Sequence, residues 1–341
     1  TLPRPAILIP SGIILLAALL LVPRAVEARQ PVTLRVGAGE RYPTPAAALA
    51  VARPGDTIRV SAGVYRGALV VDRPVVLEGE SGAVLDGGGE GTVVTLAADS
   101  VELRGFVIRN GGRSLDRDEA AVKLERCTGC AVVGNRIEDS AHGIYLLESR
   151  GATIAKNTIT GDLALREARR GNGIHLFHSS GNRLEGNVIR SSRDGIYFSF
   201  SSGNEVVAND VAHVRYGLHY MYSDDNRFLG NRFRRNAAGA AIMFSKRIVF
   251  RDNVFSEHVG YRAYGILLQT SSQIVAERNR IEGNLVGLFL DNSTRNLFRG
   301  NAIIGNGTGV DLLTSAESNT FTENVIVHNR TPVRSVIGGG E

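Results

Sequence analysis

Apolar and polar positions alternate in short runs along most of the chain, and these runs recur at a nearly fixed interval. An Asn followed two residues later by an apolar residue recurs from Asn135 to Asn324, mostly every 22 residues, with two longer intervals of 30 and 26. A small residue precedes each Asn by fourteen positions (fifteen in the last unit). Six positions after this small residue comes a Ser, or a Cys in the first unit. This period, without helical segments between the runs, indicates a β-solenoid.

The alternation assigns a direction to each position of a unit. The first and third residues after the small residue, and the second after the Asn, are almost all aliphatic or aromatic and are expected to fill the lumen. The second and fourth residues after the small residue are expected to point outward. Each unit then forms one coil of about three short strands, and coils stack at about 4.8 Å. The sequence therefore predicts an all-β fold, a parallel β-helix with coils of about 22 residues.

The chain divides into three predicted parts. Arg4, the apolar run Ile13–Val22 and small residues near Ala28 predict a signal peptide over residues 1–28, which places the protein outside the cytoplasm. Residues 29–120 are looser and predict an N-terminal cap, with a short helix near 45–52, followed by the first coils. Residues 121–341 hold the regular repeats. The longer units predict loops around 161–170 and 256–265.

Composition narrows the function classes. The net charge is +5, from 39 basic and 34 acidic residues, which is too mild to indicate nucleic-acid binding. Cys127 and Cys130 form a lone CxxC that is compatible with a disulfide, a redox pair or half of a metal site. Cys127 also occupies the Ser column and Cys130 the column that later holds Asn, so both are interpreted first as replacements within the repeat.

The outward columns contain unusual side chains for a surface in water. His219 and Met221 lie two residues apart on one predicted strand, and Met243 lies one coil further along the column of Met221. Thioether and imidazole groups suit Cu(I), so these three residues are candidate metal ligands. The alternative left open is that they line an apolar docking face.

An enzymatic interpretation is the runner-up. Parallel β-helices often act on acidic polysaccharides as lyases, epimerases or hydrolases, or bind carbohydrate, and such reactions need clustered acids and bases. The outward columns of the middle coils hold no carboxylate, and Asp224 and Asp225 are interpreted as solvated turn residues. The sequence therefore favours a protein that is not an enzyme.

Several stretches together resemble the NosD family: "GAVLDGGGEGTVV", "RGNGIHL", "GLHYMYS" followed by "AIMFS", and "ENVIVHNRTPV". The resemblance implies a right-handed parallel β-helix in the periplasm that assists the maturation of nitrous oxide reductase. It implies an ABC transporter permease and ATPase, a copper chaperone lipoprotein and the apo reductase as partners, with membrane association through them. It also makes His219, Met221 and Met243 candidates for transient Cu(I) transfer to the copper-sulfide centre. The family commonly continues into a Trp-containing C-terminal segment, whereas this chain has no Trp.

Overall fold

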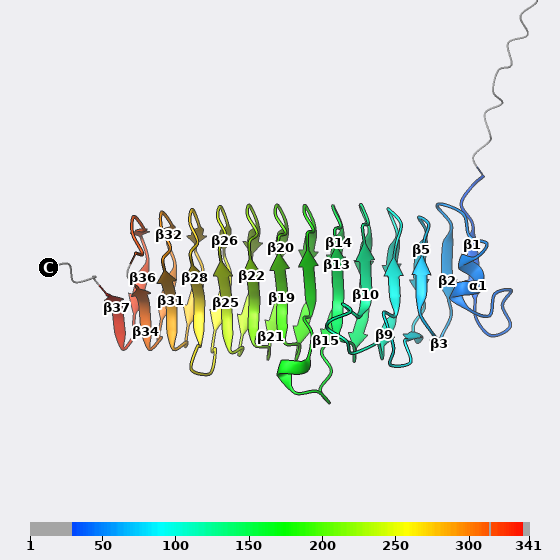
Figure 1. The fold of residues 1–341 in the computed structure, drawn as a ribbon, viewed down its shortest axis with the longest axis horizontal. Helices are drawn as coiled ribbons and strands as arrows, with labels where there is room; N and C mark the ends of the chain where they lie inside the picture. The colour runs from blue at the N-terminus through cyan, green and yellow to red at the C-terminus, as the bar shows by residue number, and fades with distance from the viewer. Residues whose placement is uncertain (1–28, 314, 337–341) are drawn as a thin grey trace, which may run out of the picture. The chain divides into compact units, whose positions relative to one another are not determined.

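Most coils contribute one strand to each of three long parallel sheets, as Figure 1 shows. The computed structural model describes residues 29–313 and 315–336, and the predicted signal peptide lies outside them. The short helix α1 (Pro45–Leu49) begins at the N-cap Thr44, whose side chain accepts a hydrogen bond from the Ala47 N–H. The predicted parallel β-helix with an N-terminal capping helix is confirmed.

The bounds of the strands follow the three sheets. Sheet A contains β1 (Thr33–Val36), β2 (Thr57–Val60), β5 (Val76–Gly79), β8 (Glu102–Arg104), β11 (Ala131–Val133), β14 (Thr153–Ala155), β17 (Arg183–Glu185), β20 (Glu205–Val207), β23 (Arg227–Leu229), β26 (Val249–Arg251), β29 (Val275–Glu277), β32 (Leu297–Arg299) and β35 (Thr320–Thr322). Sheet B contains β3 (Gly63–Arg66), β6 (Ala83–Asp86), β9 (Val107–Arg109), β12 (Arg136–Glu138), β15 (Thr158–Thr160), β18 (Val188–Arg190), β21 (Asp210–Ala212), β24 (Arg232–Arg234), β27 (Val254–Ser256), β30 (Arg280–Glu282), β33 (Ala302–Ile304) and β36 (Val325–Val327). Sheet C contains β4 (Leu69–Val71), β7 (Val94–Leu96), β10 (Ala120–Glu125), β13 (His142–Leu147), β16 (Ile174–Phe177), β19 (Asp194–Ser199), β22 (Tyr216–Met221), β25 (Ala238–Met243), β28 (Tyr264–Gln269), β31 (Val286–Asp291), β34 (Thr308–Leu312) and β37 (Thr331–Ser335).

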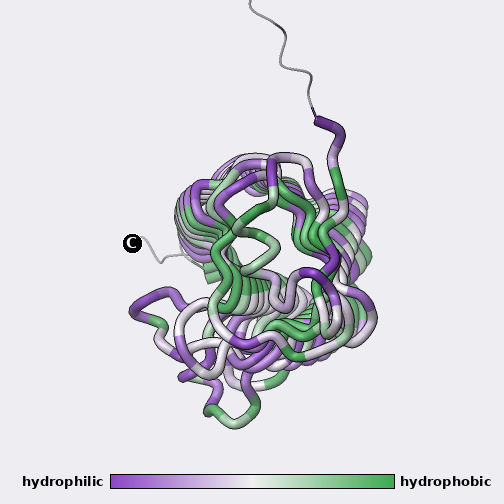
Figure 2. Tube along the Cα trace, turned by 90° about the vertical axis from the view of Figure 1, so that its right-hand side faces the viewer, coloured by the Kyte–Doolittle hydropathy of each residue, from purple (hydrophilic) through white to green (hydrophobic). Residues whose placement is uncertain are grey.

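The lumen is a continuous apolar core. The view in Figure 2 shows the coils lying one behind another. Ile196 and Phe198 pair in register with Leu218 and Tyr220 of the next coil, and all four are buried. Phe228 stacks on Phe250 of the following coil, with ring centroids 4.9 Å apart. Inward positions therefore form ladders of like side chains, as the alternation predicts.

A buried Asn ladder joins the coils at one corner. The backbone N–H of Asn209 donates to Oδ1 of Asn231 over 2.9 Å, and Nδ2 of Asn209 donates to the same oxygen over 3.0 Å and to the Leu184 carbonyl over 2.9 Å. The same pattern runs from Asn135 to Asn324. Because a buried backbone N–H needs a partner, this column fixes both the turn and the stacking.

His258 replaces Asn in a second ladder. Nδ1 of His258 accepts the backbone N–H of Asn236 over 3.2 Å, and the backbone N–H of His258 donates to Oδ1 of Asn284 over 3.1 Å. The side chain is buried, and burial lowers the pKa of His258 to about 3. The imidazole therefore acts as a neutral ladder member.

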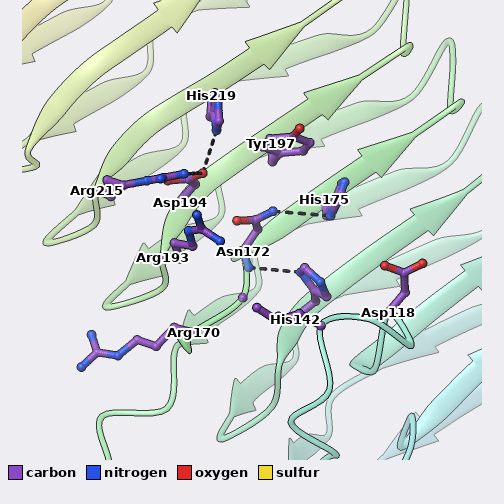
Figure 3. Close-up of a pocket in the computed structure, with 12 residues that line it drawn as sticks. Asp118, His142, Arg170, Asn172, His175, Arg193, Asp194, Tyr197, Arg215 and His219 are labelled. Carbon is purple, nitrogen blue, oxygen red and sulfur yellow. Dashed lines mark hydrogen bonds and ion pairs between the residues drawn. The ribbon is translucent and has the colours of Figure 1, made fainter. Parts of the chain in front are cut away.

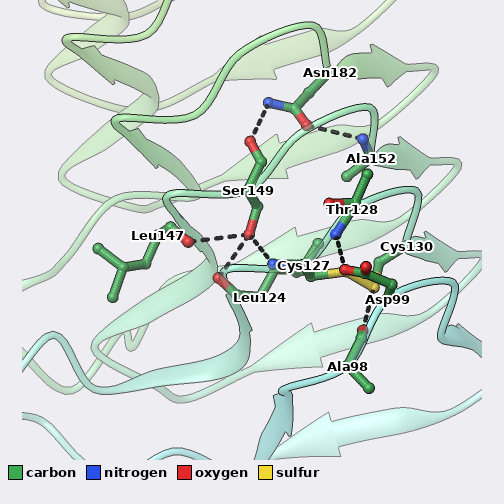
Figure 4. The surroundings of a disulfide bond; sticks show 10 residues. All are labelled: Ala98, Asp99, Leu124, Cys127, Thr128, Cys130, Leu147, Ser149, Ala152 and Asn182. Atoms are coloured by element: carbon green, nitrogen blue, oxygen red, sulfur yellow. Dashed lines mark hydrogen bonds between the residues drawn. A yellow bond between two sulfur atoms is a disulfide. The ribbon is translucent and has the colours of Figure 1, made fainter. Parts of the chain in front are cut away.

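Cys127 and Cys130 form a disulfide inside the repeat, as Figure 4 shows. The Cys127 N–H donates to Oγ of Ser149 over 3.1 Å, just as the Ser149 N–H donates to Oγ of Ser179 in the next coil. Both sulfur atoms lie in the core. The interpretation as replacements within the repeat is confirmed, and the pairing is a disulfide.

Besides residues 87–93, three longer connections leave the solenoid at the same corner, between a strand of sheet B and the following strand of sheet C. They run over residues 110–119, 161–173 and 257–263, and the second contains the 3-10 helix η1 (Glu167–Arg169). The second and third are the predicted loops, and they project from the lower edge of the ribbon in Figure 1. All three therefore begin or end beside the outer face of sheet C.

Candidate functional site on the outer face of sheet C

Most side chains on the outer face of sheet C are half-buried or buried. Tyr145, Ala241 and Asp311 lie in the outward columns yet are buried, and most other members are half-buried. The rings stack edge to face along the column, as for Tyr145 on His175 and His175 on Tyr197, with centroids 4.6 and 4.5 Å apart. Neighbouring side chains on this face therefore cover one another, although they point away from the lumen.

The structure places the three candidate metal ligands on adjacent strands. Met221 of β22 and Met243 of β25 are register partners, and His219 lies two residues before Met221 on the same face. All three side chains are half-buried. Sδ of Met221 accepts a hydrogen bond from the Tyr197 hydroxyl over 3.8 Å. Met243 lines a separate hollow of about 240 Å³ beside Phe289.

A buried carboxylate orients the imidazole of His219. Asp194 is 1% exposed, and its Oδ2 lies 2.8 Å from Nδ1 of His219. Arg215 donates to both oxygens of Asp194, through Nε over 2.8 Å and Nη2 over 2.7 Å. Burial raises the pKa of Asp194, but the hydrogen bonds from His219 and Arg215 outweigh it, so the pKa lies below its usual value. Nε2 remains the ring nitrogen that can contact a metal.

The sequence analysis did not identify Asp194 as a site residue, although its fixed place in the repeat is visible in the sequence. Asp194 lies one residue before Gly195, where strict alternation would turn a side chain inward. The alternation breaks at this glycine. A Cβ added to Gly195 would lie within 2.2 Å of the buried Val211, so Gly195 faces the lumen, as does the next residue, Ile196. The residues before the small residue therefore face outward and form a third outer column, with His142, Asn172 and Asp194 in successive coils.

These side chains line a cavity of about 270 Å³, shown in Figure 3. Nδ1 of His142 accepts the backbone N–H of Asn172 over 3.1 Å. Burial, reinforced by Lys123, lowers the pKa of His142 to about 4. Burial and the neighbouring His142 also lower the pKa of His175 well below its usual value. His175, which the sequence places two coils from His219, thus lines the same cavity.

An exposed aromatic ladder flanks the methionines. His178, Phe200, Tyr222 and Phe244 stack face to face across four coils, with centroids 5.0 to 5.3 Å apart and planes within 11° of parallel. Phe200, Tyr222 and Phe244 are 48%, 47% and 42% exposed. Each of these residues is the fifth after the small residue of its coil and has a positive φ. This backbone conformation turns the side chain away from the sheet. The sequence analysis missed this column, which the 22-residue spacing reveals.

Two tests give negative findings for the described part of the chain. No group of three or more His, Cys, Asp or Glu is arranged there to hold a metal. No helix among the described residues is long and apolar enough to cross a membrane.

Comparison with known proteins decides the family. Residues 155–340, more than half of the chain, match the family described as periplasmic copper-binding protein (NosD). The probable ABC transporter binding protein NosD of Pseudomonas aeruginosa is 43% identical over 292 residues, which cover 81% of this chain and 68% of that protein. The chain belongs to the NosD family. A Stutzerimonas stutzeri protein with the same name is 33% identical over 137 residues, covering 40% of this chain and 31% of that protein.

Other matches bear on the fold of this NosD family member. Residues 38–210 also match a family of unknown function, DUF1565. The Dettilon tailspike protein superposes with a TM-score of 0.66 at 15% identity, covering 82% of this chain and 62% of that one. The mannuronan C-5 epimerase AlgE4 A-module of Azotobacter vinelandii gives 0.56 at 14% identity, covering 84% and 91%. At such identities the likeness shows a shared β-helix fold alone.

Proposed function

We propose that this NosD family member is an exported, periplasmic accessory protein that helps assemble the copper-sulfide centre of nitrous oxide reductase. In this proposal it works with an ABC transporter permease and ATPase, receives Cu(I) from a lipoprotein chaperone and passes it to the apo reductase. Copper is a cargo that rests transiently on the chain, and the chain itself catalyses no reaction. The family description as copper-binding and the relatives' name as transporter-binding support the proposal.

One observation carries the copper part. The two methionines of the chain are register partners on neighbouring strands, beside a histidine that is held by a buried carboxylate. Histidines that bind metals usually donate their other ring N–H to a carboxylate or carbonyl, as His219 does to Asp194. Two thioethers and one imidazole form a soft, uncharged set that suits Cu(I) over harder divalent ions. His219, Met221 and Met243 are accordingly the proposed ligands.

The aromatic ladder supports the docking part. Three rings, each between 42% and 48% exposed, form a continuous apolar strip directly beside Met221 and Met243. Exposed aromatic side chains are enriched where protein interfaces form. We therefore propose that a partner protein covers this strip during copper transfer, so that the cargo leaves without entering bulk water.

A complementation experiment separates the two parts. A strain lacking the gene should export nitrous oxide reductase without its copper-sulfide centre, and the wild-type gene should restore it. A variant with His219→Ala, Met221→Leu and Met243→Leu should fail to restore the centre yet still co-purify with the transporter. A variant with Phe200→Ser, Tyr222→Ser and Phe244→Ser should bind Cu(I) but lose a partner.

The readout is the spectrum and copper content of the purified reductase. A fully metallated reductase in the deletion strain would overturn the maturation role. Release of unsaturated sugars from uronate polymers by the purified protein would instead establish the polysaccharide-active enzyme considered as the alternative.

A further inference from the structure

The cavity beside His219 is lined by arginine and histidine side chains that copper binding does not explain. Its floor comes from the outer face of sheet C, and residues before β10 and β16 contribute Leu115, Asp118 and Arg170 to its rim. Figure 3 shows imidazole and guanidinium groups gathered around this space. A guanidinium, or a ring nitrogen that carries a proton, has no lone pair for a metal ion, so a different ligand has to be considered.

The hydrogen-bonding groups of the cavity are mostly donors. Because Nδ1 of His142 accepts the Asn172 N–H, the neutral ring carries its proton on Nε2. Nδ1 of His175 lies 3.4 Å from the amide nitrogen of Asn172, which can only donate, so the proton of His175 also sits on Nε2. That Nε2 is buried and has no partner among the described residues.

Arg193 adds a second unsatisfied donor. Its Nε is buried and lacks a hydrogen-bond partner in the described part of the chain. A buried donor without a partner costs about 1–3 kcal/mol, and more when it is charged. Two such donors lining one cavity point to a ligand that accepts hydrogen bonds.

The charge of the lining limits which acceptor fits. Arg170, Arg193 and Arg215 face Asp118 and Asp194, so the lining carries one more guanidinium than carboxylate. Arg215 pairs with Asp194, and Arg170 donates to two backbone carbonyls. Arg193 is the guanidinium of this lining that has no side-chain partner among the described residues. One excess positive charge matches a monovalent anion better than phosphate or sulfate.

The size of the cavity narrows the choice further. A volume of about 270 Å³ lies just below the range of about 300–1,000 Å³ that is usual for small-molecule pockets. This volume exceeds the need of a bare inorganic ion and accommodates a small organic molecule. The remaining class is a small organic acid, with the planar guanidinium of Arg193 available for a two-point contact with a carboxylate.

We propose that this pocket binds the carboxylate of a small organic acid, with Arg193 and Nε2–H of His175 as the main donors and Nε2–H of His142 as a third. The ligand is held independently of copper, on the side of His219 away from Met243. Two sources share this chemistry, a simple aliphatic acid and a sugar acid. Both place one carboxylate against the same donors.

The test is isothermal titration of the full, copper-free chain with acetate, glucuronate, neutral glucose and inorganic phosphate. We expect saturable binding of a carboxylate and none of glucose. Tighter binding of glucuronate assigns the sugar-acid source, and equal or tighter binding of acetate assigns the simple acid. No carboxylate binding at 1:1 stoichiometry, or tighter binding of phosphate, overturns the proposal.

Two variants locate the ligand. Arg193→Gln and His175→Gln should each weaken carboxylate binding by about 10- to 100-fold, the effect of losing a hydrogen bond to a charged group. Arg232→Gln, an exposed arginine on sheet B, makes the same charge change and should leave affinity unchanged. Circular dichroism confirms that each variant is folded. Unchanged affinity in a folded Arg193→Gln variant contradicts the proposed site.

Discussion

Replacing Asp194 by Asn should weaken Cu(I) binding without touching a proposed ligand. The amide keeps the shape of the carboxylate but removes the charge that holds the Nδ1–H of His219 and both donors of Arg215. Loss of such an outer-shell partner typically costs 10- to 100-fold in metal affinity, about 1.4–2.7 kcal/mol. The affinity is measured by competition with a chromogenic Cu(I) chelator at pH 7.

Stability changes in the same variant, so a matched control is needed. Arg215 loses its counter-charge but is itself 30% exposed, and we expect a loss of about 1–3 kcal/mol in the free energy of unfolding. Asp210 supplies the control, because it lies in the same coil on sheet B and pairs with Arg190 and Arg234. Asp210→Asn should leave Cu(I) affinity unchanged. Equal affinities in the two variants would refute the argument that Asp194 orients a metal ligand.

Three further predictions concern the scaffold and are measured by denaturant unfolding. The folded pKa of His258 is about 3 and its unfolded value is 6.5, so the unfolded chain takes up this proton first as pH falls. The contribution of His258 to stability therefore drops by about 1.6 kcal/mol between pH 6.5 and 5. His258→Asn should remove this loss, and an unchanged pH slope would contradict it. Replacing Cys127 by Ser and Cys130 by Asn should leave the free energy of unfolding nearly unchanged. The short disulfide loop contributes only about 2 kcal/mol, and the replacements restore the Ser and Asn of the ladders. A loss well beyond about 2 kcal/mol would show a larger role for the disulfide. Asn231→Ala should lower the free energy of unfolding by about 3–5 kcal/mol, because buried hydrogen-bonding groups lose their partners. Asn324→Ala, at the half-buried end of the column, should lower it by less than half as much. Equal losses would argue against a stabilising role of the Asn ladder.

The fold was predictable because it is repetitive. Eight of the nine units share the same Asn spacing and eight share the same Ser spacing, so each position of a coil could be placed from its column alone. The capping helix, the two longer loops and the partnership of Met221 with Met243 are confirmed. The handedness, the domain boundaries and the signal peptide stay predictions. In a solenoid, sequence spacing converts directly into spatial neighbours.

The site was predictable only in part, for a local reason. Strict alternation assigns the residue before each small position to the core, but the chain turns at Gly195 and equivalent glycines, so Asp194 and His142 reach the outer face instead. The aromatic ladder likewise depends on positive φ at Phe200 and Tyr222, which a two-residue period does not describe. Both columns were visible in the 22-residue repeat, although not in the alternation.

X-ray absorption of the Cu(I)-loaded protein identifies the atoms bound to copper. With both cysteines in a disulfide, any sulfur bound to copper has to come from Met221 and Met243. We expect two thioether sulfurs and one imidazole nitrogen around copper, with both sulfurs lost in the Met221→Leu, Met243→Leu variant. A copper shell of nitrogen and oxygen alone, unchanged in that variant, would contradict this prediction.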